Sequence, residues 1–248
     1  MSPSRRVALV TGSGRGIGRA TALVLARRGY DVVVHDLLAA GAEETAGFVR
    51  EIGARAVSYV ADVTDREAMK KVVASVEADF GPISVLVNNA GTSSDRCPLE
   101  DVTPEMFRRS IDTHVGGTLF LTQAVIPGMK ERRYGRIVNL SSIQALVGWA
   151  NSATYNAAKG AIIAMSKGWA KEFAPWKICV NVVAPGHTET EMTIKNDSAE
   201  LRAEKAKTIP LGRYAQASEM GEAIAFLASE EASFITGQVL SPDGGFGA

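Results

Sequence analysis

Apolar and polar residues follow two different spacings along the chain. Short runs rich in Val and Ile are apolar on both faces, as the buried strands of a parallel sheet are. Each run is followed by a longer segment in which apolar residues recur at helical spacing. The pattern predicts strands at 7–12, 31–36, 56–62, 83–91, 135–142, 178–186 and 237–245, and helices at 17–28, 40–52, 65–79, 104–131, 153–173 and 217–228.

Regular alternation of strands and helices favours an α/β fold in which one doubly wound parallel sheet of about seven strands is flanked by helices on both faces. No linker, repeat or low-complexity tract interrupts the pattern, so we expect residues 1–248 to form a single domain. The segment 187–216 is the exception. We expect it to be irregular or partly helical and to form a lid over a substrate.

Composition narrows the classes of partner. Lys and Arg number 27, as do Asp and Glu, so no net charge attracts the chain to nucleic acid or to an anionic membrane. No apolar run approaches the roughly 18 residues of a membrane span, and the run after Arg6 is too short for a signal peptide. Cys97 and Cys179 lie far apart, which fits a reducing compartment. We expect a cytoplasmic protein without nucleic-acid or membrane partners.

A glycine-rich stretch, TGSGRGIG, joins the first predicted strand to the first helix. It does not match G-x-G-x-x-G, because Ile17 stands where the third glycine belongs, but Gly12, Gly16 and Gly18 fit T-G-x-x-x-G-x-G. Such glycines permit a tight turn and let a pyrophosphate approach the helix N-terminus. An ordinary glycine-rich turn has the same composition, so this motif alone does not establish a nucleotide site.

A carboxylate follows at the expected distance. Asp36 ends the second predicted strand, 20 residues after Gly16, where an acidic residue binds the adenosine ribose of NAD. Its charge would repel the 2′-phosphate of NADP, whereas Arg15 would attract it. We give Asp36 the greater weight and predict NAD, with NADP as the alternative. Asp36 could instead cap the second helix.

Tyr155 and Lys159 are four residues apart and share one face of a predicted helix. A free tyrosine ionises near pH 10, and a neighbouring ammonium would lower that pKa enough for acid/base work. Ser142 ends a predicted strand, at the sheet edge where ligands of doubly wound sheets bind. Its hydroxyl would hydrogen-bond a substrate oxygen. A Tyr-x-x-x-Lys pair by itself also occurs by chance on helix surfaces.

The combination is far more specific. With TGSGRGIG, NNAG (88–91), Ser142, YNAAK (155–159) and VAPG (183–186) in this order, the chain resembles the short-chain dehydrogenase/reductase family. Within the family it is most similar to the 3-oxoacyl-carrier-protein reductase group and to related alcohol and sugar dehydrogenases. The resemblance extends through FITGQVLSPDGG near the end of the chain. It implies a Rossmann-type fold, a homotetramer, and NAD(P)-dependent interconversion of a secondary alcohol and a ketone.

The resemblance also implies roles for single residues. Tyr155 matches the general acid/base, Ser142 the partner of the substrate oxygen, and Lys159 the residue that holds the nicotinamide ribose. The chain also matches the cofactor-binding segments of the family in the glycine-rich turn, after three of the strands, and in the loop after VAPG. Their contact residues are Gly12, Arg15, Gly16, Ile17, Gly18, Asp36, Asp62, Val63, Asn88, Ala90, Gly91, Pro185, Gly186, Thr188 and Thr190. Substrate contacts are expected from Ser142, Tyr155, Gln144, Trp149 and Met192.

His114 departs from the family pattern. In HVGGTLFLTQA (114–124) it occupies the position of an asparagine that holds a water connecting the active-site lysine to solvent. We expect His114 to keep this proton path as a fourth catalytic residue and to add an ionisation near neutral pH. A hydrogen-bonded core histidine is the alternative. No histidine pair has metal-ligand spacing, so we expect no metal site.

A second class of function remains: a catalytically weak member that binds dinucleotide as a sensor or scaffold. The histidine at position 114 is its only support, whereas the presence of Ser142, Tyr155 and Lys159 favours an enzyme.

Overall fold

The computed structural model describes residues 5–93 and 95–248. Among these residues, seven parallel strands form one sheet in the order β3-β2-β1-β4-β5-β6-β9, which confirms the predicted fold class. A separate pair of short strands, β7 and β8, lies outside it. The strands of the main sheet are β1 (Val7–Thr11), β2 (Asp31–Asp36), β3 (Ala56–Val60), β4 (Ile83–Asn88), β5 (Gly135–Leu140), β6 (Ile178–Val183) and β9 (Val239–Leu240).

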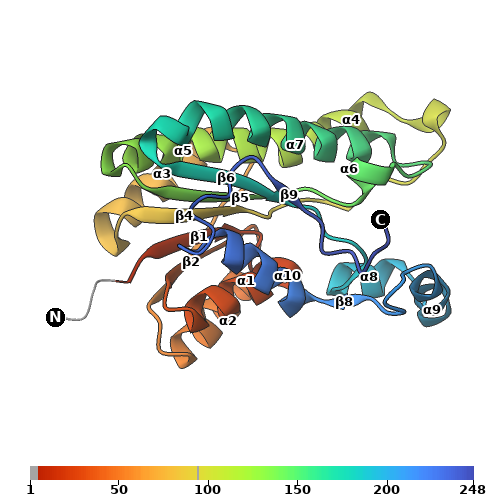
Figure 1. Cartoon of the computed structure of the whole chain (residues 1–248), viewed down its shortest axis with the longest axis horizontal. Helices are drawn as coiled ribbons and strands as arrows, with labels where there is room; N and C mark the ends of the chain where they lie inside the picture. Colours follow the sequence, from red (N-terminus) through yellow and green to blue (C-terminus); the bar gives the residue numbers. More distant parts are fainter. Residues whose placement is uncertain (1–4, 94) are drawn as a thin grey trace.

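Helices cover both faces of the sheet (Figure 1). On one face lie α1 (Gly16–Arg27), α2 (Ala39–Glu51) and α10 (Ala217–Leu227), and on the other α3 (Arg66–Ser75), α5 (Gly117–Arg132) and α7 (Ala153–Phe173). Each face of the sheet has its own hydrophobic core, and alternate residues of β1 belong to different cores. Ala8 and Val10 pack toward α1, whereas Val7 and Leu9 pack toward α3 and α5. Period-two alternation therefore fills both layers from one strand.

The order of the strands reverses between β1 and β4, because β2 and β3 lie on one side of β1 and the later strands on the other. Doubly wound sheets bind ligands in a crevice at the carboxyl ends of the strands where the order reverses in this way, so we expect the site there.

Two predicted helices differ from the structure. The region 104–131 is α4 (Pro104–Ser110), a π-helical turn η3 (Ile111–Gly116) and then α5, while the region 65–79 ends in a second π-helical turn, η1 (Val76–Phe80). Each π-helical turn inserts an extra residue per turn, which periodicity cannot reveal.

Strand ends are shorter than predicted. Ser142 lies two residues past the end of β5, and β9 ends at Leu240 because Ser241 and Pro242 follow, and proline has no N–H to continue the ladder. The strand β3 is half-buried rather than buried on both faces, because it is the edge of the sheet.

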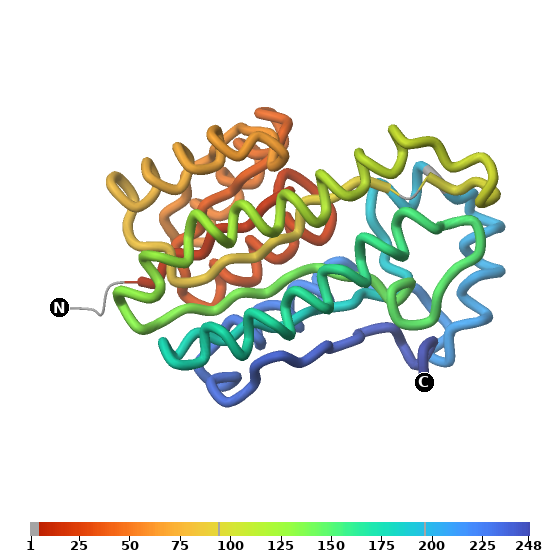
Figure 2. Tube along the Cα trace, turned by 90° about the horizontal axis from the view of Figure 1, so that it is seen from above, coloured from red at the N-terminus to blue at the C-terminus, as the bar shows by residue number. Residues whose placement is uncertain are grey.

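The segment 187–216 has more regular structure than expected. It contains β7 (Thr188–Glu189), α8 (Glu191–Asn196), α9 (Ala199–Lys207) and β8 (Ala215–Gln216), with β7 and β8 paired in parallel. Figures 1 and 2 both show this segment beside the C-terminus, at the end of the molecule opposite the N-terminus. The short helix α6 (Gln144–Val147) lies at the same end.

Candidate active site

The glycine-rich turn has the backbone geometry that a pyrophosphate cradle needs. Gly12 and Gly16 have φ values of +60° and +54°, in the left-handed region that favours glycine. A Cβ at Gly18 would lie 2.2 Å from the carbonyl oxygen of Gly12, so no side chain fits there. Arg15 is the N-cap residue of α1, and its side chain makes no capping hydrogen bond. The first turn of α1 therefore presents the backbone of its glycines, rather than side chains, to a ligand at the carboxyl ends of the strands.

Asp36 holds this turn directly. Its Oδ2 accepts a hydrogen bond from the amide of Gly14 at 2.8 Å, and its Oδ1 accepts one from the amide of Leu38 at 3.0 Å. The N-cap residue of α2 is Leu38, so the alternative role of Asp36 as a helix cap is wrong. The carboxylate is fixed beside the turn, with its charge at the crevice.

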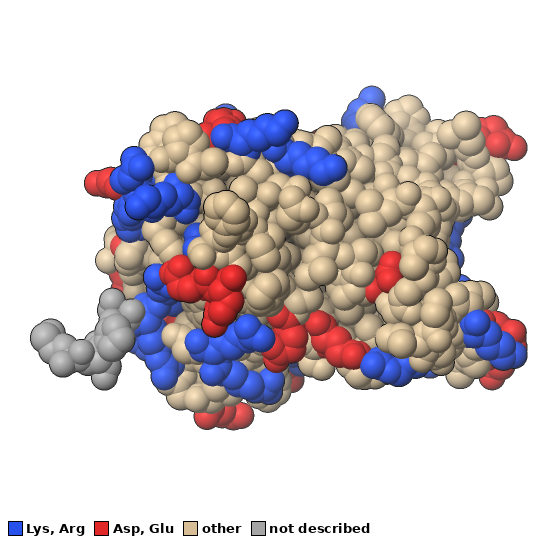
Figure 3. Space-filling view, in the orientation of Figure 1, with Lys and Arg blue, Asp and Glu red and all other residues tan. Residues whose placement is uncertain are grey.

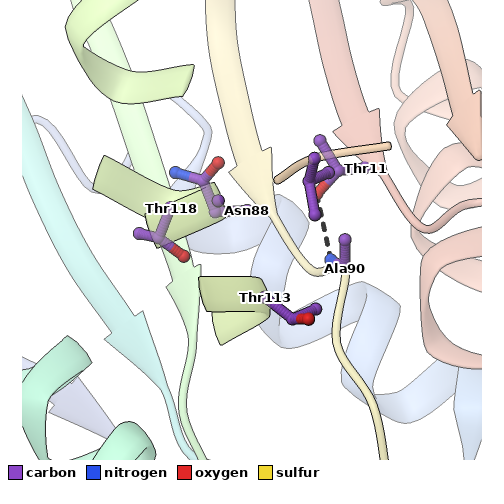
Figure 4. A pocket seen from close by; sticks show the side chains of 7 residues that line it. Thr11, Asn88, Ala90, Thr113 and Thr118 are labelled. Carbon is purple, nitrogen blue, oxygen red and sulfur yellow. Dashed lines mark hydrogen bonds between the residues drawn. The ribbon is translucent and has the colours of Figure 1, made fainter. Parts of the chain in front are cut away.

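Three of the predicted cofactor residues, Val63, Asn88 and Ala90, line one small pocket with Thr11 at the ends of β1 and β4 (Figure 4). The amide of Ala90 donates to Thr11 Oγ1 at 3.0 Å, which ties the loop after β4 to β1. The side chain of Asn88 is fixed by the neighbouring strand β5, because its Nδ2 donates to Asn139 Oδ1 at 2.8 Å. Asp62 accepts from the amide of Thr64 at 2.8 Å, one residue before the pocket.

The helix α7 brings Tyr155 and Lys159 together one turn apart, and Ser142 reaches them from the loop after β5. The Ser142 side chain hydrogen-bonds Tyr155, which lowers the pKa of the phenol, but burial outweighs it and raises this pKa above its ordinary value. Lys159 Nζ donates to the carbonyl of Leu140 at 2.8 Å and lies 5.5 Å from the centroid of the tyrosine ring.

The expected lowering of the tyrosine pKa by the ammonium is therefore wrong for this arrangement. Desolvation instead lowers the pKa of Lys159 to about 7. The lysine ammonium donates to a backbone carbonyl, and burial decides the direction in which the pKa of the phenol shifts.

His114 lies in the π-helical turn η3. Its side chain is buried at the site formed by Ser142, Tyr155 and Lys159. Its ring meets the ring of Tyr155 edge to face at 5.3 Å between centroids, and its Nε2 lies 3.5 Å from Thr92 Oγ1. A Cβ at Gly91 would lie 2.5 Å from its Cε1, so the ring fills the space beside the backbone of Gly91.

Burial, and after it the positive charge of Lys159, lower the pKa of His114 to about 2. The prediction of an added ionisation near neutral pH is therefore wrong, because this imidazole stays neutral throughout that range. Its Nδ1 is buried and has no hydrogen-bond partner among the described residues.

The loop after β6 closes over the glycine-rich turn. Thr188 Oγ1 donates to the carbonyl of Gly186 at 3.1 Å, which shapes the loop that follows Pro185. Thr190 caps α8, and its Cβ would lie 3.6 Å from a Cβ built on Gly16. The predicted cofactor residues from opposite ends of the chain thus meet at one place.

Next to them stands a group of aromatic rings that we call the aromatic wall: Trp149, His187, Tyr214 and Phe246. The centroid of the His187 ring lies 4.9 Å from that of Tyr214, 5.2 Å from that of Trp149 and 5.4 Å from that of Phe246. Sequence reasoning found only Trp149. The other three come from segments whose local pattern carries no signal, and only the tertiary fold brings them together.

The remaining substrate candidates differ in placement. Gln144 begins α6 next to Ser142, and its buried Oε1 has no partner among the described residues. Met192 is exposed on α8.

Metal ligands and membrane-spanning helices were also expected to be absent. No group of three or more His, Cys, Asp or Glu side chains there has the placement of a metal site. No helix among these residues has the length and apolar character needed to cross a membrane.

Comparisons with known proteins identify the family of the chain. Residues 12–247 match the family model described as enoyl-(acyl carrier protein) reductase. The chain is 40% identical over 245 residues to cis-4-hydroxycyclohexanecarboxylate dehydrogenase of Sinomonas cyclohexanicum, covering 99% of this chain and 98% of the relative. It is also 40% identical over 240 residues to a 3-oxoacyl-[acyl-carrier-protein] reductase of Thermotoga maritima, covering 97% of each.

Solved structures are similar over the same length. NAD⁺-bound xylitol dehydrogenase superposes with a TM-score of 0.92 at 36% identity, covering 97% of this chain and 98% of that one. Levodione reductase gives a TM-score of 0.93 at 31% identity, covering 97% and 96%. The chain belongs to the short-chain dehydrogenase/reductase family and is an NAD(P)-dependent oxidoreductase that interconverts secondary alcohols and ketones.

Proposed function

We propose that the enzyme prefers NAD over NADP and uses Tyr155 as its general acid/base. The observation that carries the cofactor preference is the carboxylate of Asp36, held against the amide of Gly14. A 2′-phosphate placed at this carboxylate would meet its negative charge, whereas ribose hydroxyls can donate to it. Arg15 is exposed and has no ion pair among the described residues, so its charge remains available to favour NADP.

The residues fit a bound dinucleotide. Left-handed glycines and the N-terminus of α1 would hold the pyrophosphate, and Asp62, Val63, Asn88, Ala90 and Gly91 would flank the adenosine. When bound, the nicotinamide supplies or accepts the hydride. In our proposal Pro185, Gly186, Thr188 and Thr190 lie against its carboxamide and phosphates.

The chain's own groups would handle the proton. Tyr155 would give its phenolic proton to the carbonyl oxygen of a ketone, or take the proton of an alcohol. Ser142, already hydrogen-bonded to Tyr155, would bind the same substrate oxygen as charge develops on it. Lys159 would turn from the carbonyl of Leu140 to the ribose hydroxyls.

His114 would act as a neutral group. Its Nε2 is directed at Thr92, and its unpartnered Nδ1 is free to hold a water on the path between Lys159 and solvent. This keeps the proposed proton path but moves protons through a hydrogen-bonded water rather than through an imidazolium.

Turnover on a panel of secondary alcohols and ketones, with both cofactors, tests the proposal. We expect kcat/KM with NAD(H) to exceed that with NADP(H), and equal or reversed values would contradict the role of Asp36. Tyr155→Phe should abolish nearly all turnover while NADH still binds. Binding of NADH by the unmodified enzyme without any turnover would favour the sensor or scaffold function instead.

We also propose a homotetramer in the cytoplasm. The helices α5 and α7 would form one interface, and the free thiols of Cys97 and Cys179 suit a reducing compartment.

A further inference from the structure

The aromatic wall has a cation placed over it. The guanidinium of Arg96, in the loop after β4, lies 5.3 Å from the centroid of the Trp149 ring. Trp149 in turn packs on His187, next to the loop that carries the predicted carboxamide contacts. Arg96 therefore stands at the outer edge of the surface on which a substrate would lie.

This arginine lacks an acidic partner. The adjacent Asp95 is taken by Arg109, whose Nη2 donates to both carboxylate oxygens at 2.6 Å. Within the described residues no carboxylate lies within ion-pair distance of Arg96. A planar guanidinium with free donors beside an aromatic face is well suited to hold a carboxylate.

The charges around the wall add to this preference. Asp197 is the acidic group near Tyr214 and His187, and it is already paired with Lys205 at 2.6 Å. Arg202 donates to the backbone carbonyl of the same aspartate at 2.8 Å. Three cations, Arg96, Arg202 and Lys205, thus act on His187 and Tyr214 beside the carboxylate of Asp197. A second carboxylate, Asp243, accepts hydrogen bonds from the amides of Gly245 and Gly247, on either side of Phe246. Figure 3 shows Lys or Arg atoms at the edge of the hollow at this end of the molecule.

Buried polar groups of the wall and of α6 also lack hydrogen-bond partners in the described part of the chain. Gln144 Oε1 and Tyr214 Oη are buried without hydrogen-bond partners in the described part of the chain. Tyr214 is only 5% exposed, so its hydroxyl has little access to solvent. A ligand that enters between the wall and Ser142 would bring the missing partners.

From these contacts we propose that the substrate is a small carboxylate with an apolar body. Arg96 binds the carboxylate, the aromatic wall packs on the body, and the hydroxyl or keto carbon lies between Ser142 and Tyr155. A single guanidinium over the Trp149 ring matches a monoanion better than a dianionic phosphate, which needs more donors. The inference deepens the proposed dehydrogenase function and rests on it for the reacting group alone.

Binding of unreactive probes tests the carboxylate site without requiring turnover. Cyclohexanecarboxylate and its neutral analogue cyclohexanecarboxamide are titrated calorimetrically into the enzyme saturated with NADH. We expect the carboxylate to bind at least tenfold more tightly than the amide. Arg96→Gln should weaken the carboxylate about tenfold, equivalent to about 1.4 kcal/mol, and leave the amide unchanged. Arg96→Lys should fall between, because it keeps the charge but not the planar fork.

Two controls separate recognition from packing. Arg108→Gln removes an exposed arginine of α4 that pairs with Glu105, and it should change neither ligand's affinity. The NADH affinity and melting temperature of Arg96→Gln should match those of the unmodified enzyme. If Arg96→Gln weakens both ligands equally, the guanidinium only packs on Trp149 and the proposal fails.

Other outcomes also overturn it. These are equal binding of both probes by the unmodified enzyme, or no carboxylate binding at about 1 mM, the upper end of usual KM values. If Arg96→Gln weakens the binding of acetoacetyl-CoA and of neither probe, the arginine binds a phosphate of coenzyme A instead of a carboxylate. Turnover of neutral alcohols with hydroxycyclohexanecarboxylates inert would sink this inference and leave the proposed function standing. Carboxylate binding without any turnover would support this inference and contradict the proposed dehydrogenase function.

Discussion

Burial of His114 makes the free energy of unfolding depend on pH. In the folded state its pKa is about 2, against an ordinary value of 6.5, because the ring is buried and faces Lys159. Between these values the unfolded chain binds a proton that the folded chain does not. The free energy of unfolding therefore falls as the pH drops through 6.5, and below about pH 2 the loss is complete.

This predicts a pH-dependent effect of His114→Asn on stability. At pH 4.5 the loss caused by the histidine amounts to about 3 kcal/mol, and an asparagine does not titrate. The variant should therefore gain about that much free energy of unfolding relative to the unmodified enzyme between pH 8 and pH 4.5. Urea unfolding at both pH values measures it. An equal difference at the two pH values would show that the imidazole is not held neutral.

The same substitution bears on catalysis. A neutral His114 adds no ionisation between pH 5 and 8, so the pH profile of kcat/KM should keep its shape in His114→Asn. A limb with a pKa near 6.5 that disappears in the variant would contradict this and restore the imidazolium relay.

Gly91 and His114 form a coupled pair. A methyl group at Gly91 would lie 2.5 Å from the imidazole, so Gly91→Ala should destabilise the fold by about 1–3 kcal/mol through overpacking. In the His114→Ala background, where the ring is absent, the cost should nearly vanish. A double-mutant cycle on unfolding free energies measures the coupling, and additive effects would mean that the ring moves aside.

At the scale of elements, local patterns predicted what depends on neighbours in sequence. The glycine-rich turn and the Tyr155–Lys159 pair needed only spacing. The structure has left-handed glycines in that turn, and it places Lys159 Nζ 5.5 Å from the centroid of the Tyr155 ring. The π-helical turn η3 escaped prediction because helical periodicity has no signature for one inserted residue. The aromatic wall escaped it because four separate segments contribute one ring each, and nothing local marks Tyr214 or Phe246.

The helix α8 predicts a repulsion at the glycine-rich turn expected to bind the pyrophosphate. Glu191 begins α8, and its Oε2 would lie 3.6 Å from a Cβ at Gly16, beside the expected site of two phosphate charges. Glu191→Gln should therefore tighten NADH binding, by about 0.3–1 kcal/mol on the scale of a charge near a helix N-terminus. Fluorescence titration measures the change. The matched control is Glu189→Gln, which removes an exposed carboxylate of β7 bonded to Gln216. Equal effects of the two substitutions would argue against a local repulsion.

At the scale of the whole molecule, one apolar face is available for assembly. A groove between α5 and α7 is lined by Leu119, Ile126 and Trp169 together with polar side chains. These are the helices at which the proposed homotetramer would associate. A charge placed there would be buried without a partner in the assembly, which costs far more than the same charge in solvent.

Leu119→Asp should therefore dissociate the tetramer to smaller species, as measured by size-exclusion chromatography with light scattering. Phe48→Asp is the matched control, because Phe48 is 36% exposed against 37% for Leu119 but belongs to α2, on the opposite face of the sheet. It should leave the tetramer intact. An unmodified enzyme that is monomeric at micromolar concentration would refute the assembly. If both variants stay tetrameric, the interface lies elsewhere than α5 and α7. If NADH binding is retained in a dissociated Leu119→Asp enzyme, each protomer holds a complete cofactor site, as the contacts within one chain require.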